Sequence, residues 1–339
     1  MDLTFLLAIF VLFGPSEQFI FFGSGNPLES FNVDQTKISV SGISSGAAMA
    51  TQMHVIFSRD IMGVGLIAGV PFACAGSVGS SLSCMSAPNL VSPAQLEATT
   101  SAGALVGNID ATSHMSHDRV YIYNGKLDSV INPGIGQKIA DFYGHFVNPS
   151  SNIKTVFNVS SEHGQITDNF GGACGQLQSS NFINNCGYNA AYDLLNHIYG
   201  GQLQKPTAQT QQRGMLKSFS QSDFFYVSTP SMYSMANDGY VYVPSGCASK
   251  TKKCKLHVAF HGCAMYHDRI ADAYVRHGGY NEVAELNDII ILYPQTIKSA
   301  TNPQGCWDWF GYTGTLFATN NGFQPTALKR MIDKAASIA

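Results

Sequence analysis

The fold is decided by the stretch Gly42-Ile43-Ser44-Ser45-Gly46, which follows an apolar alternating run at residues 37–41. Small residues at 47–50 come next and can begin a helix. A strand, Gly-x-Ser-x-Gly and a helix in this order predict a sharp turn that holds the Ser44 hydroxyl above the end of a sheet. The helix behind the turn would point its free N–H groups at a developing negative charge. The motif therefore predicts a nucleophilic serine at position 44.

Two candidate partners of this serine follow in the chain, each after a strand-like run. Asp128 comes after the run at residues 119–123, and His163 lies just after the run at 153–159. Serine, aspartate and histidine in this order, at the carboxyl ends of strands, are typical of α/β-hydrolases. Taken singly, Asp128 also fits an ordinary turn residue and His163 a solvated loop histidine. Their order and placement together predict a catalytic triad with Ser44.

A buried-strand pattern at residues 256–260 runs into the turn His261-Gly262-Cys263. In α/β-hydrolases a turn of this type donates the second N–H group of the oxyanion hole. We therefore expect the amides of Ser45 and Cys263 to form that hole. An ordinary strand-to-loop turn is the alternative, and only the candidate triad argues against it.

The order of these motifs is unusual, because the His-Gly turn normally precedes the serine turn in this class. A circular permutation explains it: the C-terminal helix, expected over 325–339, would precede the first strand in space. Residues 201–245 would then hold the strands that normally begin the fold. Two independent domains joined near residue 205 are the alternative, but the first would lack its oxyanion loop. We expect an α/β-hydrolase fold, circularly permuted, in a single domain with a mostly parallel central sheet.

Several motifs of the chain recur in the same order and with similar spacing in a known family. They are residues 38–46 (ISVSGISSG), 184–186 (NNC), 239–244 (GYVYVP), 257–263 (HVAFHGC), 290–295 (IILYPQ) and 305–309 (GCWDW). From about residue 31 onward, the chain resembles the secreted polyhydroxybutyrate (PHB) depolymerases with a single, circularly permuted catalytic domain. The resemblance implies the same triad and the same pair of oxyanion-hole amides.

The resemblance also implies a substrate subsite. Trp309 would form a wall of the site that holds a 3-hydroxybutyrate unit, and Trp307 is a second aromatic candidate beside it. Burial in the core is the alternative for both side chains. Two departures from the family are Ala47, where it tends to have glycine, and a shorter loop after Gln295. The second departure affects the rim that would contact the polymer.

The triad and the resemblance together imply an extracellular serine esterase that hydrolyses poly(3-hydroxybutyrate) or its oligomers through an acyl-enzyme. This chemistry needs no cofactor. Wider relatives of the family include carbohydrate-ester hydrolases, so an acetyl or feruloyl esterase is one alternative. A secreted binding protein without activity is the other, although the complete triad speaks against it.

An apolar run at residues 3–13 is too short to span a bilayer but suits the core of a signal peptide. Asp2 and the absence of Lys or Arg before the run are atypical of such peptides. The sequence predicts a signal peptide within residues 1–25 and a catalytic domain over residues 26–339. Cleavage is expected between Gly14 and Gly25. A hydrophobic N-terminal strand or an uncleaved anchor is the alternative.

Eight cysteines, an even number, suit a secreted protein with disulfides, although eight allow about a hundred connectivities. Proximity in the sequence suggests three pairs and leaves a fourth: Cys74–Cys84, Cys174–Cys186, Cys247–Cys254 and Cys263–Cys306. The fourth would tether the oxyanion loop to the tryptophan loop. No C-x-x-C pair occurs, so a zinc site is the less favoured alternative and we expect no metal.

The 339-residue chain is 45% hydrophobic and only 12% charged, which predicts a globular protein with a large core. A formal net charge of −3 gives no basic surface and argues against nucleic acid as a partner. We expect a polyester or other ester as the substrate, no stable membrane association, and a monomer. The glycosylation sequon Asn158-Val159-Ser160 falls in the strand expected before His163, so we expect burial to keep it unmodified.

Overall fold

The computed structural model describes residues 26–337 with the exception of residue 227. The predicted signal peptide and its cleavage site lie outside the described residues. The strands are β1 (Val33–Ile43), β2 (Gly63–Ile67), β3 (Arg119–Tyr123), β4 (Ile153–Val156), β5 (Gln165–Thr167), β6 (Gly172–Ala173), β7 (Ile183–Asn185), β8 (Met215–Ser220), β9 (Asp238–Val243), β10 (Cys254–Phe260) and β11 (Ile289–Tyr293).

The α-helices are α1 (Ser45–Ile56), α2 (Cys74–Val78), α3 (Ser81–Ser86), α4 (Pro93–Leu105), α5 (Gly134–Phe146), α6 (Ala190–Ile198), α7 (His267–Ile270), α8 (Ala273–His277), α9 (Tyr280–Asn287) and α10 (Phe323–Ala336). Short 3-10 helices lie at Pro88–Leu90, Thr112–His117, Ser150–Asn152, Ser222–Phe224, Pro230–Tyr233 and Ser245–Cys247. In the described part of the chain, no helix is both long and apolar enough to cross a membrane.

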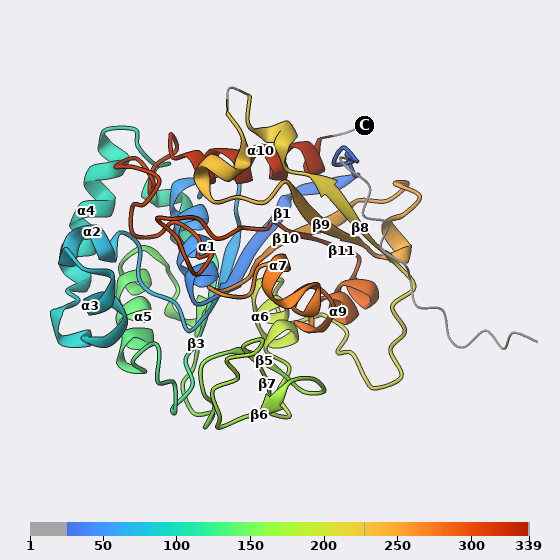
Figure 1. Cartoon of the computed structure of the whole chain (residues 1–339), viewed down its shortest axis with the longest axis horizontal. Helices are drawn as coiled ribbons and strands as arrows, with labels where there is room; N and C mark the ends of the chain where they lie inside the picture. Colours follow the sequence, from blue (N-terminus) through green and yellow to red (C-terminus); the bar gives the residue numbers. More distant parts are fainter. Residues whose placement is uncertain (1–25, 227, 338–339) are drawn as a thin grey trace, which may run out of the picture.

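The central sheet has eight strands in the order β4-β3-β2-β1-β10-β11-β9-β8. Its neighbouring strands are parallel, except that β9 runs antiparallel to both β11 and β8. The strand that leads to the serine turn, β1, therefore lies in the middle of the sheet beside β10 (Figure 1). This is the mostly parallel sheet that the sequence predicts. A small separate sheet holds β5, β7 and β6.

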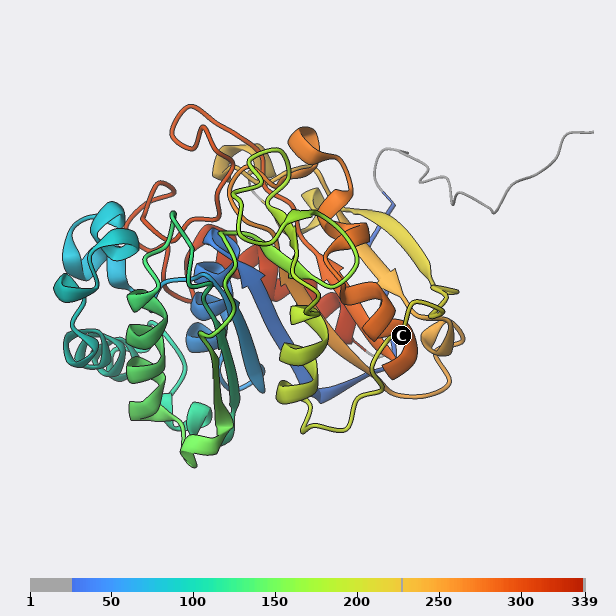
Figure 2. The same cartoon turned by 90° about the horizontal axis from the view of Figure 1, so that it is seen from below.

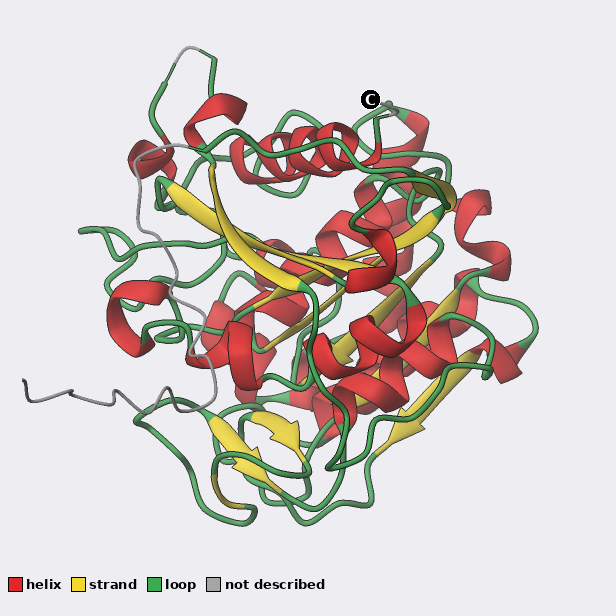
Figure 3. Cartoon of the chain, turned by 90° about the vertical axis from the view of Figure 1, so that its right-hand side faces the viewer, coloured by secondary structure: helices red, strands yellow, loops and turns green. Residues whose placement is uncertain are grey.

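Helices cover both faces of the central sheet, as Figure 3 shows. On one face α1 and α10 contact β1 and each other, whereas α6 and α9 pack together on the other face (Figure 2). The helices α2, α3 and α4 form a group at one side of the molecule, where α2 contacts α3 and α4, and both of these contact α5. The α/β layering confirms the predicted fold class.

The C-terminal helix ends beside the start of the first strand. The N–H of Phe31 donates to the carbonyl oxygen of Ala335 at 2.9 Å, and the hydroxyls of Ser30 and Ser337 are 2.8 Å apart. The strands β8 and β9 lie within the region predicted to hold the opening strands of the unpermuted fold. Because strands from both halves of the chain share one sheet, the alternative of two independent domains is wrong.

The strand before His163 is shorter than expected. It ends at Val156, because its partner β3 ends at Tyr123 and the chain beyond pairs irregularly with the loop at 124–128. Asn158 is consequently exposed and lies outside the strand. The expected burial of the sequon is therefore wrong, and so is the reason for expecting it to be unmodified.

Four disulfides link the chain, and they are the pairs that proximity suggests: Cys74–Cys84, Cys174–Cys186, Cys247–Cys254 and Cys263–Cys306. The first joins α2 to α3, and the second closes the segment that begins just after β6 and carries β7. The fourth joins the His-Gly turn after β10 to the loop that carries the two tryptophans. Three of the four thus fix irregular segments near the carboxyl ends of the parallel strands.

A neutral histidine lies inside the sheet below the serine turn. The side chain of His257, on β10, is fully buried. Its Nδ1 lies 2.7 Å from Ser39 Oγ and its Nε2 2.7 Å from Ser41 Oγ, so the ring joins β10 to β1. Burial lowers the pKa of His257 to about 3. The imidazole therefore remains uncharged at neutral pH.

We expect acidification to destabilise the fold through His257 and His261. Burial lowers the pKa of His261 to about 4, whereas histidines in an unfolded chain titrate near about 6.5. The unfolded chain therefore binds protons that the folded chain excludes as the pH falls below about 6.5. The stabilising contribution is complete above that pH and declines by up to about 1.4 kcal/mol per pH unit for each histidine.

Urea unfolding at neutral and mildly acidic pH measures this loss. His257→Gln should make the free energy of unfolding less dependent on pH than in the original chain. The matched control is His114→Gln, because His114 is exposed. The same pH dependence in both variants would contradict the role of His257.

Candidate active site

Ser44 occupies the turn between β1 and α1 with φ 56° and ψ −121°. This backbone conformation is strained for serine, and the surrounding close packing holds it. A Cβ atom on Gly42 would lie 2.3 Å from the backbone of Gly46, and one on Gly46 would lie 2.3 Å from the carbonyl oxygen of Phe260. Both positions therefore require glycine. The same contacts press the serine turn against the end of β10.

A buried pair of side chains lies at the carboxyl edge of β3 and β4. His163 Nδ1 is 3.0 Å from Asp128 Oδ2, and the two side chains are 5% and 1% exposed. The N–H groups of Val130 and Ile131 donate to the other carboxylate oxygen at 2.9 and 2.7 Å. These bonds fix the carboxylate, which in turn orients the imidazole and leaves its Nε2 available for proton transfer.

Ser44 lies near this pair, because β1, β3 and β4 are parallel and end at the same edge of the sheet. In the described part of the chain the imidazole of His163 bonds to Asp128 and not to Ser44 Oγ. Hydrogen bonds between a nucleophile and its base often tighten only in the complex with substrate. The structure thus brings the three predicted triad residues together.

One aromatic ring contacts the histidine, and a buried tyrosine lies near its aspartate partner. The ring of Phe182 meets the His163 ring edge-on, with centroids 6.4 Å apart, from a backbone with φ 53°. The hydroxyl of Tyr123 lies 2.7 Å from Ser161 Oγ, and burial raises the pKa of Tyr123 to about 12. The phenol is therefore neutral. Tyr123 therefore adds no negative charge near Asp128.

The His-Gly turn packs directly on the serine turn. A Cβ atom on Gly262 would lie 3.4 Å from Ser44 Cβ and 3.3 Å from the carbonyl oxygen of Ile43. Ser45 and Cys263, which directly follow Ser44 and Gly262, therefore lie on adjacent segments. Such an arrangement can bind a developing oxyanion from two sides.

Trp307 does not line the space above the serine. Its side chain is 0% exposed, and its indole Nε1 donates to the carbonyl oxygen of His261 at 3.0 Å. Its ring meets Phe260 edge-on at 5.0 Å between centroids. The expectation that Trp307 contacts substrate is corrected by this burial. Trp307 and the Cys263–Cys306 disulfide together hold the His-Gly turn in place.

Trp309 stands on a loop that Asp308 organises. The buried carboxylate of Asp308 accepts hydrogen bonds from the backbone N–H groups of residues 311–313 at 2.6, 3.0 and 2.8 Å. Trp309 is 8% exposed and meets Phe310 edge-on, and Phe310 is 37% exposed. The loop therefore offers Phe310 to solvent and only an edge of Trp309.

The sequence reasoning missed two residues beside His163. Glu162 accepts a hydrogen bond from the amide of His163, and its signal was visible as an acidic residue next to the candidate base. Phe182 reaches the histidine from the segment before β7. No motif surrounds Phe182, so the sequence carries no signal for it.

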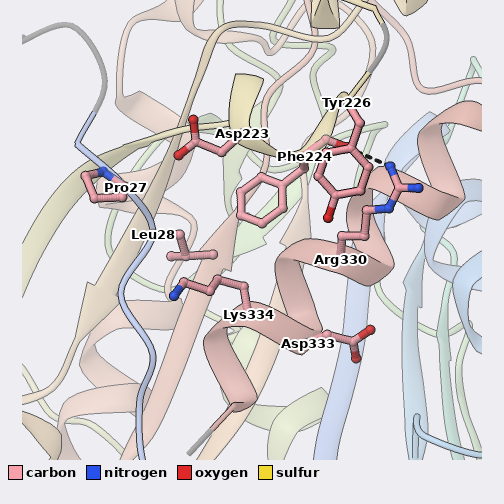
Figure 4. A pocket seen from close by; sticks show the side chains of 8 residues that line it. All are labelled: Pro27, Leu28, Asp223, Phe224, Tyr226, Arg330, Asp333 and Lys334. Atoms are coloured by element: carbon pink, nitrogen blue, oxygen red, sulfur yellow. Dashed lines mark hydrogen bonds between the residues drawn. The ribbon is translucent and has the colours of Figure 1, made fainter. Parts of the chain in front are cut away.

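Two hollows lie away from the triad, and no triad residue lines either of them. The hollow in Figure 4 has a volume of about 530 Å³ and lies between Pro27, the segment at 223–226 and α10. There Arg330 donates to the carbonyl oxygen of Phe224 and stacks on Tyr226, 4.3 Å from the ring centroid. A second hollow of about 620 Å³ lies between α2, α4 and the segment at 317–319.

Comparison with known proteins places this geometry among PHB depolymerases, although no family profile matches the chain. The poly(3-hydroxybutyrate) depolymerase of Delftia acidovorans is 37% identical over 314 residues, which cover 91% of this chain and 62% of that protein. The polyhydroxybutyrate depolymerase of Talaromyces funiculosus is 34% identical over 329 residues, which cover 91% of this chain and 92% of that protein. The chain thus spans less than two thirds of the Delftia protein.

Two solved structures are also similar. The crystal structure of PHB depolymerase from Penicillium funiculosum has a TM-score of 0.84 and 31% identity, and the match covers 92% of this chain and 99% of that one. A serine-to-alanine variant of PHB depolymerase complexed with an R3HB trimer matches with the same TM-score, identity and coverage.

Proposed function

Because this chain belongs to the polyhydroxybutyrate depolymerase family, we propose that it is a secreted serine esterase that cleaves poly(3-hydroxybutyrate) or its oligomers. The observation that carries the proposal is the buried Asp128–His163 pair at the sheet edge where the strained Ser44 turn meets the His-Gly turn. A binding protein would have no need for this combination of strain, a buried charge and an oriented imidazole.

Acyl transfer would begin at Ser44. Its Oγ attacks the ester carbonyl carbon while His163 takes its proton, and Asp128 stabilises the imidazolium that forms. The tetrahedral intermediate collapses, and His163 gives the proton to the departing alkoxide, so the alcohol leaves and an acyl-serine remains. Water activated by the same histidine then releases the acid and regenerates the serine. Besides the ester, one water molecule is consumed, and its proton passes through His163 back to the serine.

The developing oxyanion would be held by the amides of Ser45 and Cys263. Removing one such donor typically costs about 10²- to 10³-fold in rate. Because Trp307 and the Cys263–Cys306 disulfide both hold the His-Gly turn, the second donor is fixed before substrate arrives. Preorganisation of this kind spares the enzyme the cost of ordering the loop in the transition state.

Trp309 would supply an apolar wall for a hydroxybutyrate unit, and exposed apolar side chains around the triad would contact the solid polymer. Leu127 is 50% exposed and precedes Asp128, and Phe310 is 37% exposed beside Trp309. Leu177, 42% exposed, lies on the segment that packs beside Leu127. A polyester surface is apolar, so these side chains gain free energy only when a surface covers them.

Leu127→Ser and Phe310→Ser are expected to slow hydrolysis of a solid polymer film by up to about fivefold, since each removes apolar area worth about 1 kcal/mol. Hydrolysis of the soluble trimer should change by less than about twofold, because these side chains lie beside the triad and do no chemistry. Met215→Ser is the control, since Met215 is 44% exposed on β8 at the far end of the sheet. Equal losses on film and trimer would contradict the assignment.

Residues 1–25 would act as the signal peptide, and residues 26–339 as the catalytic domain. The four disulfides support export, because such bonds persist in oxidising compartments. We expect the exported domain to work as a monomer without stable membrane association. The N-terminal sequence of the exported protein locates the cleavage site.

The function is tested by incubating the purified protein with 3-hydroxybutyrate trimer and, separately, with acetylated and feruloylated glycans. Release of monomer and dimer from the trimer, with little release of acetate or ferulate, is the expected result. Preferential cleavage of a glycan ester would keep the triad and overturn the polyester substrate. If no ester is hydrolysed, including p-nitrophenyl acetate, the assignment as an esterase is overturned.

A further inference from the structure

Glu162 holds the two loops of the triad together through one oxygen atom. Its Oε2 accepts hydrogen bonds from the backbone N–H of Ser129 at 3.1 Å and from its neighbour His163 at 2.6 Å. Ser129 directly follows Asp128 in the chain. A single carboxylate oxygen therefore bridges the loop that carries the acid and the loop that carries the base.

The two loops run side by side beneath this bridge. The N–H of Lys126 donates to the carbonyl oxygen of Val159 at 2.9 Å, and that of Leu127 donates to Ser161 at 3.1 Å. These backbone bonds hold the two loops together up to the triad residues. The hydrogen bonds of Glu162 are the next contact between the loops along the chain. The bridge adds to these bonds a contact at the level of Asp128 and His163, where, among the described residues, the only other hydrogen bond between the loops is the one between their two side chains.

Glu162 itself is anchored from behind. Its own N–H donates to the carbonyl oxygen of Cys174 at 2.8 Å, and Cys174 is joined by a disulfide to Cys186. The covalent link places the anchor on the segment of the small sheet, outside both triad loops. Movement of Glu162 is therefore restricted by an element that takes no part in the chemistry.

The bridge carries a negative charge beside the base. Partial burial raises the pKa of the Glu162 carboxyl, but hydrogen bonds from Ser129 and the His163 amide outweigh it, so the pKa lies below its ordinary value. His163 contacts Asp128 from the loop after β3 and the ring of Phe182, and Glu162 is its neighbour in its own loop. The neutral phenol of Tyr123 lies near Asp128. Glu162 is thus the second carboxylate that acts on the imidazolium.

We propose that Glu162 is a positioning residue of the triad, which fixes the Asp128 loop against the His163 loop and adds negative charge next to the catalytic base. This inference rests on the proposed function, since it assigns a role within the same triad. It makes two separable contributions, one of geometry and one of charge. Glutamine can accept both backbone hydrogen bonds but carries no charge, so substitutions can tell the two contributions apart.

The test compares Glu162→Ala and Glu162→Gln with the unchanged protein on 3-hydroxybutyrate trimer and on p-nitrophenyl acetate. Glu162→Ala should lower kcat by about 10- to 100-fold with little change in KM, because the acid and base lose their alignment while substrate contacts remain. Glu162→Gln should recover most of kcat at neutral pH. In Glu162→Gln the acidic limb of the kcat/KM profile should move to lower pH by about half a unit, since the imidazolium loses a neighbouring negative charge.

Glu29→Gln is the matched control, because Glu29 is a surface carboxylate paired with Lys217 and Lys250 at the opposite edge of the sheet. A kcat within twofold of the unchanged protein in Glu162→Ala would overturn the proposal. The proposal would also be overturned if both Glu162 variants lost kcat equally, showed a lowered Tm and kept the original pH profile. The bridge would then only stabilise the fold. If the trimer is not cleaved, p-nitrophenyl acetate still reports on Glu162, so failure of the polyester assignment is distinguishable.

Discussion

Ser44→Ala is expected to lower kcat on 3-hydroxybutyrate trimer by about 10⁶-fold, the loss seen when a triad nucleophile is removed. Alanine keeps the Cβ atom, so the strained turn at φ 56° is unchanged and the fold should form normally. The amides of the oxyanion hole remain, and they leave a residual rate above that of water alone. Chromatographic detection of released monomer and dimer measures the loss.

A serine outside the site serves as the control for this substitution. Ser249 is exposed and lies before β10, at the edge of the sheet opposite the triad. Ser249→Ala should retain full activity. The nucleophile assignment fails if Ser44→Ala keeps more than about a thousandth of the original kcat, because contamination and background do not reach that level.

Asp128→Asn is expected to lower kcat by about 10⁴-fold. The asparagine oxygen can still accept the N–H bonds of Val130 and Ile131 that Asp128 Oδ1 accepts now. Its amide nitrogen would then face His163 Nδ1 and donate to it. The imidazole would be held with its proton on Nε2, which is the wrong tautomer to take a proton from the serine.

The matched control is Asp141→Asn, because Asp141 is exposed on α5 and bonds only to Gln137 among the described residues. The loss in Asp128→Asn should appear in kcat, while the Tm should change little because the backbone bonds to the side chain persist. A loss below about tenfold would show that another group orients the histidine.

Much of the site could be predicted, because several of its residues belong to short contiguous motifs. The serine turn needs glycine at positions 42 and 46, because a Cβ atom there would collide with the backbone. The sequence motif therefore predicts the geometry of the turn directly. Likewise, the His-Gly turn follows a buried strand, and strands with such apolar runs are readily recognised. The family resemblance is confirmed by relatives that share 34–37% of their residues over most of the chain.

Other parts depend on which way a side chain faces, and this is settled only by packing. Trp307 and Trp309 are two residues apart in a loop, yet the first is fully buried behind the His-Gly turn and the second remains 8% exposed. An irregular loop has no period from which the sequence could separate them. The helices α2 and α3 were missed for a related reason, because they are too short to show an amphipathic pattern.

The role of Glu162 could not be read from sequence, although its neighbour was identified. Its function depends on the loop at 124–129 lying beside the loop at 159–163, which is a property of two strands pairing. Asn158 shows the same limit, because strand β4 stops where its partner stops. A strand-like run in the sequence shows how many residues favour an extended backbone. The length of the neighbouring strand in the sheet determines where the hydrogen-bonded strand ends.

The pairing of β1 with β10 has a consequence for the synthesis of the protein. The side chains of Ser41 and His257, which touch across these strands, are 216 positions apart in the chain. During synthesis the serine turn emerges early. Strand β10 and the His-Gly turn that follows it are made only after most of the chain. Contacts so distant in sequence close slowly. Catalytic competence should therefore appear late and abruptly, and a nascent chain truncated before residue 254 should show no esterase activity.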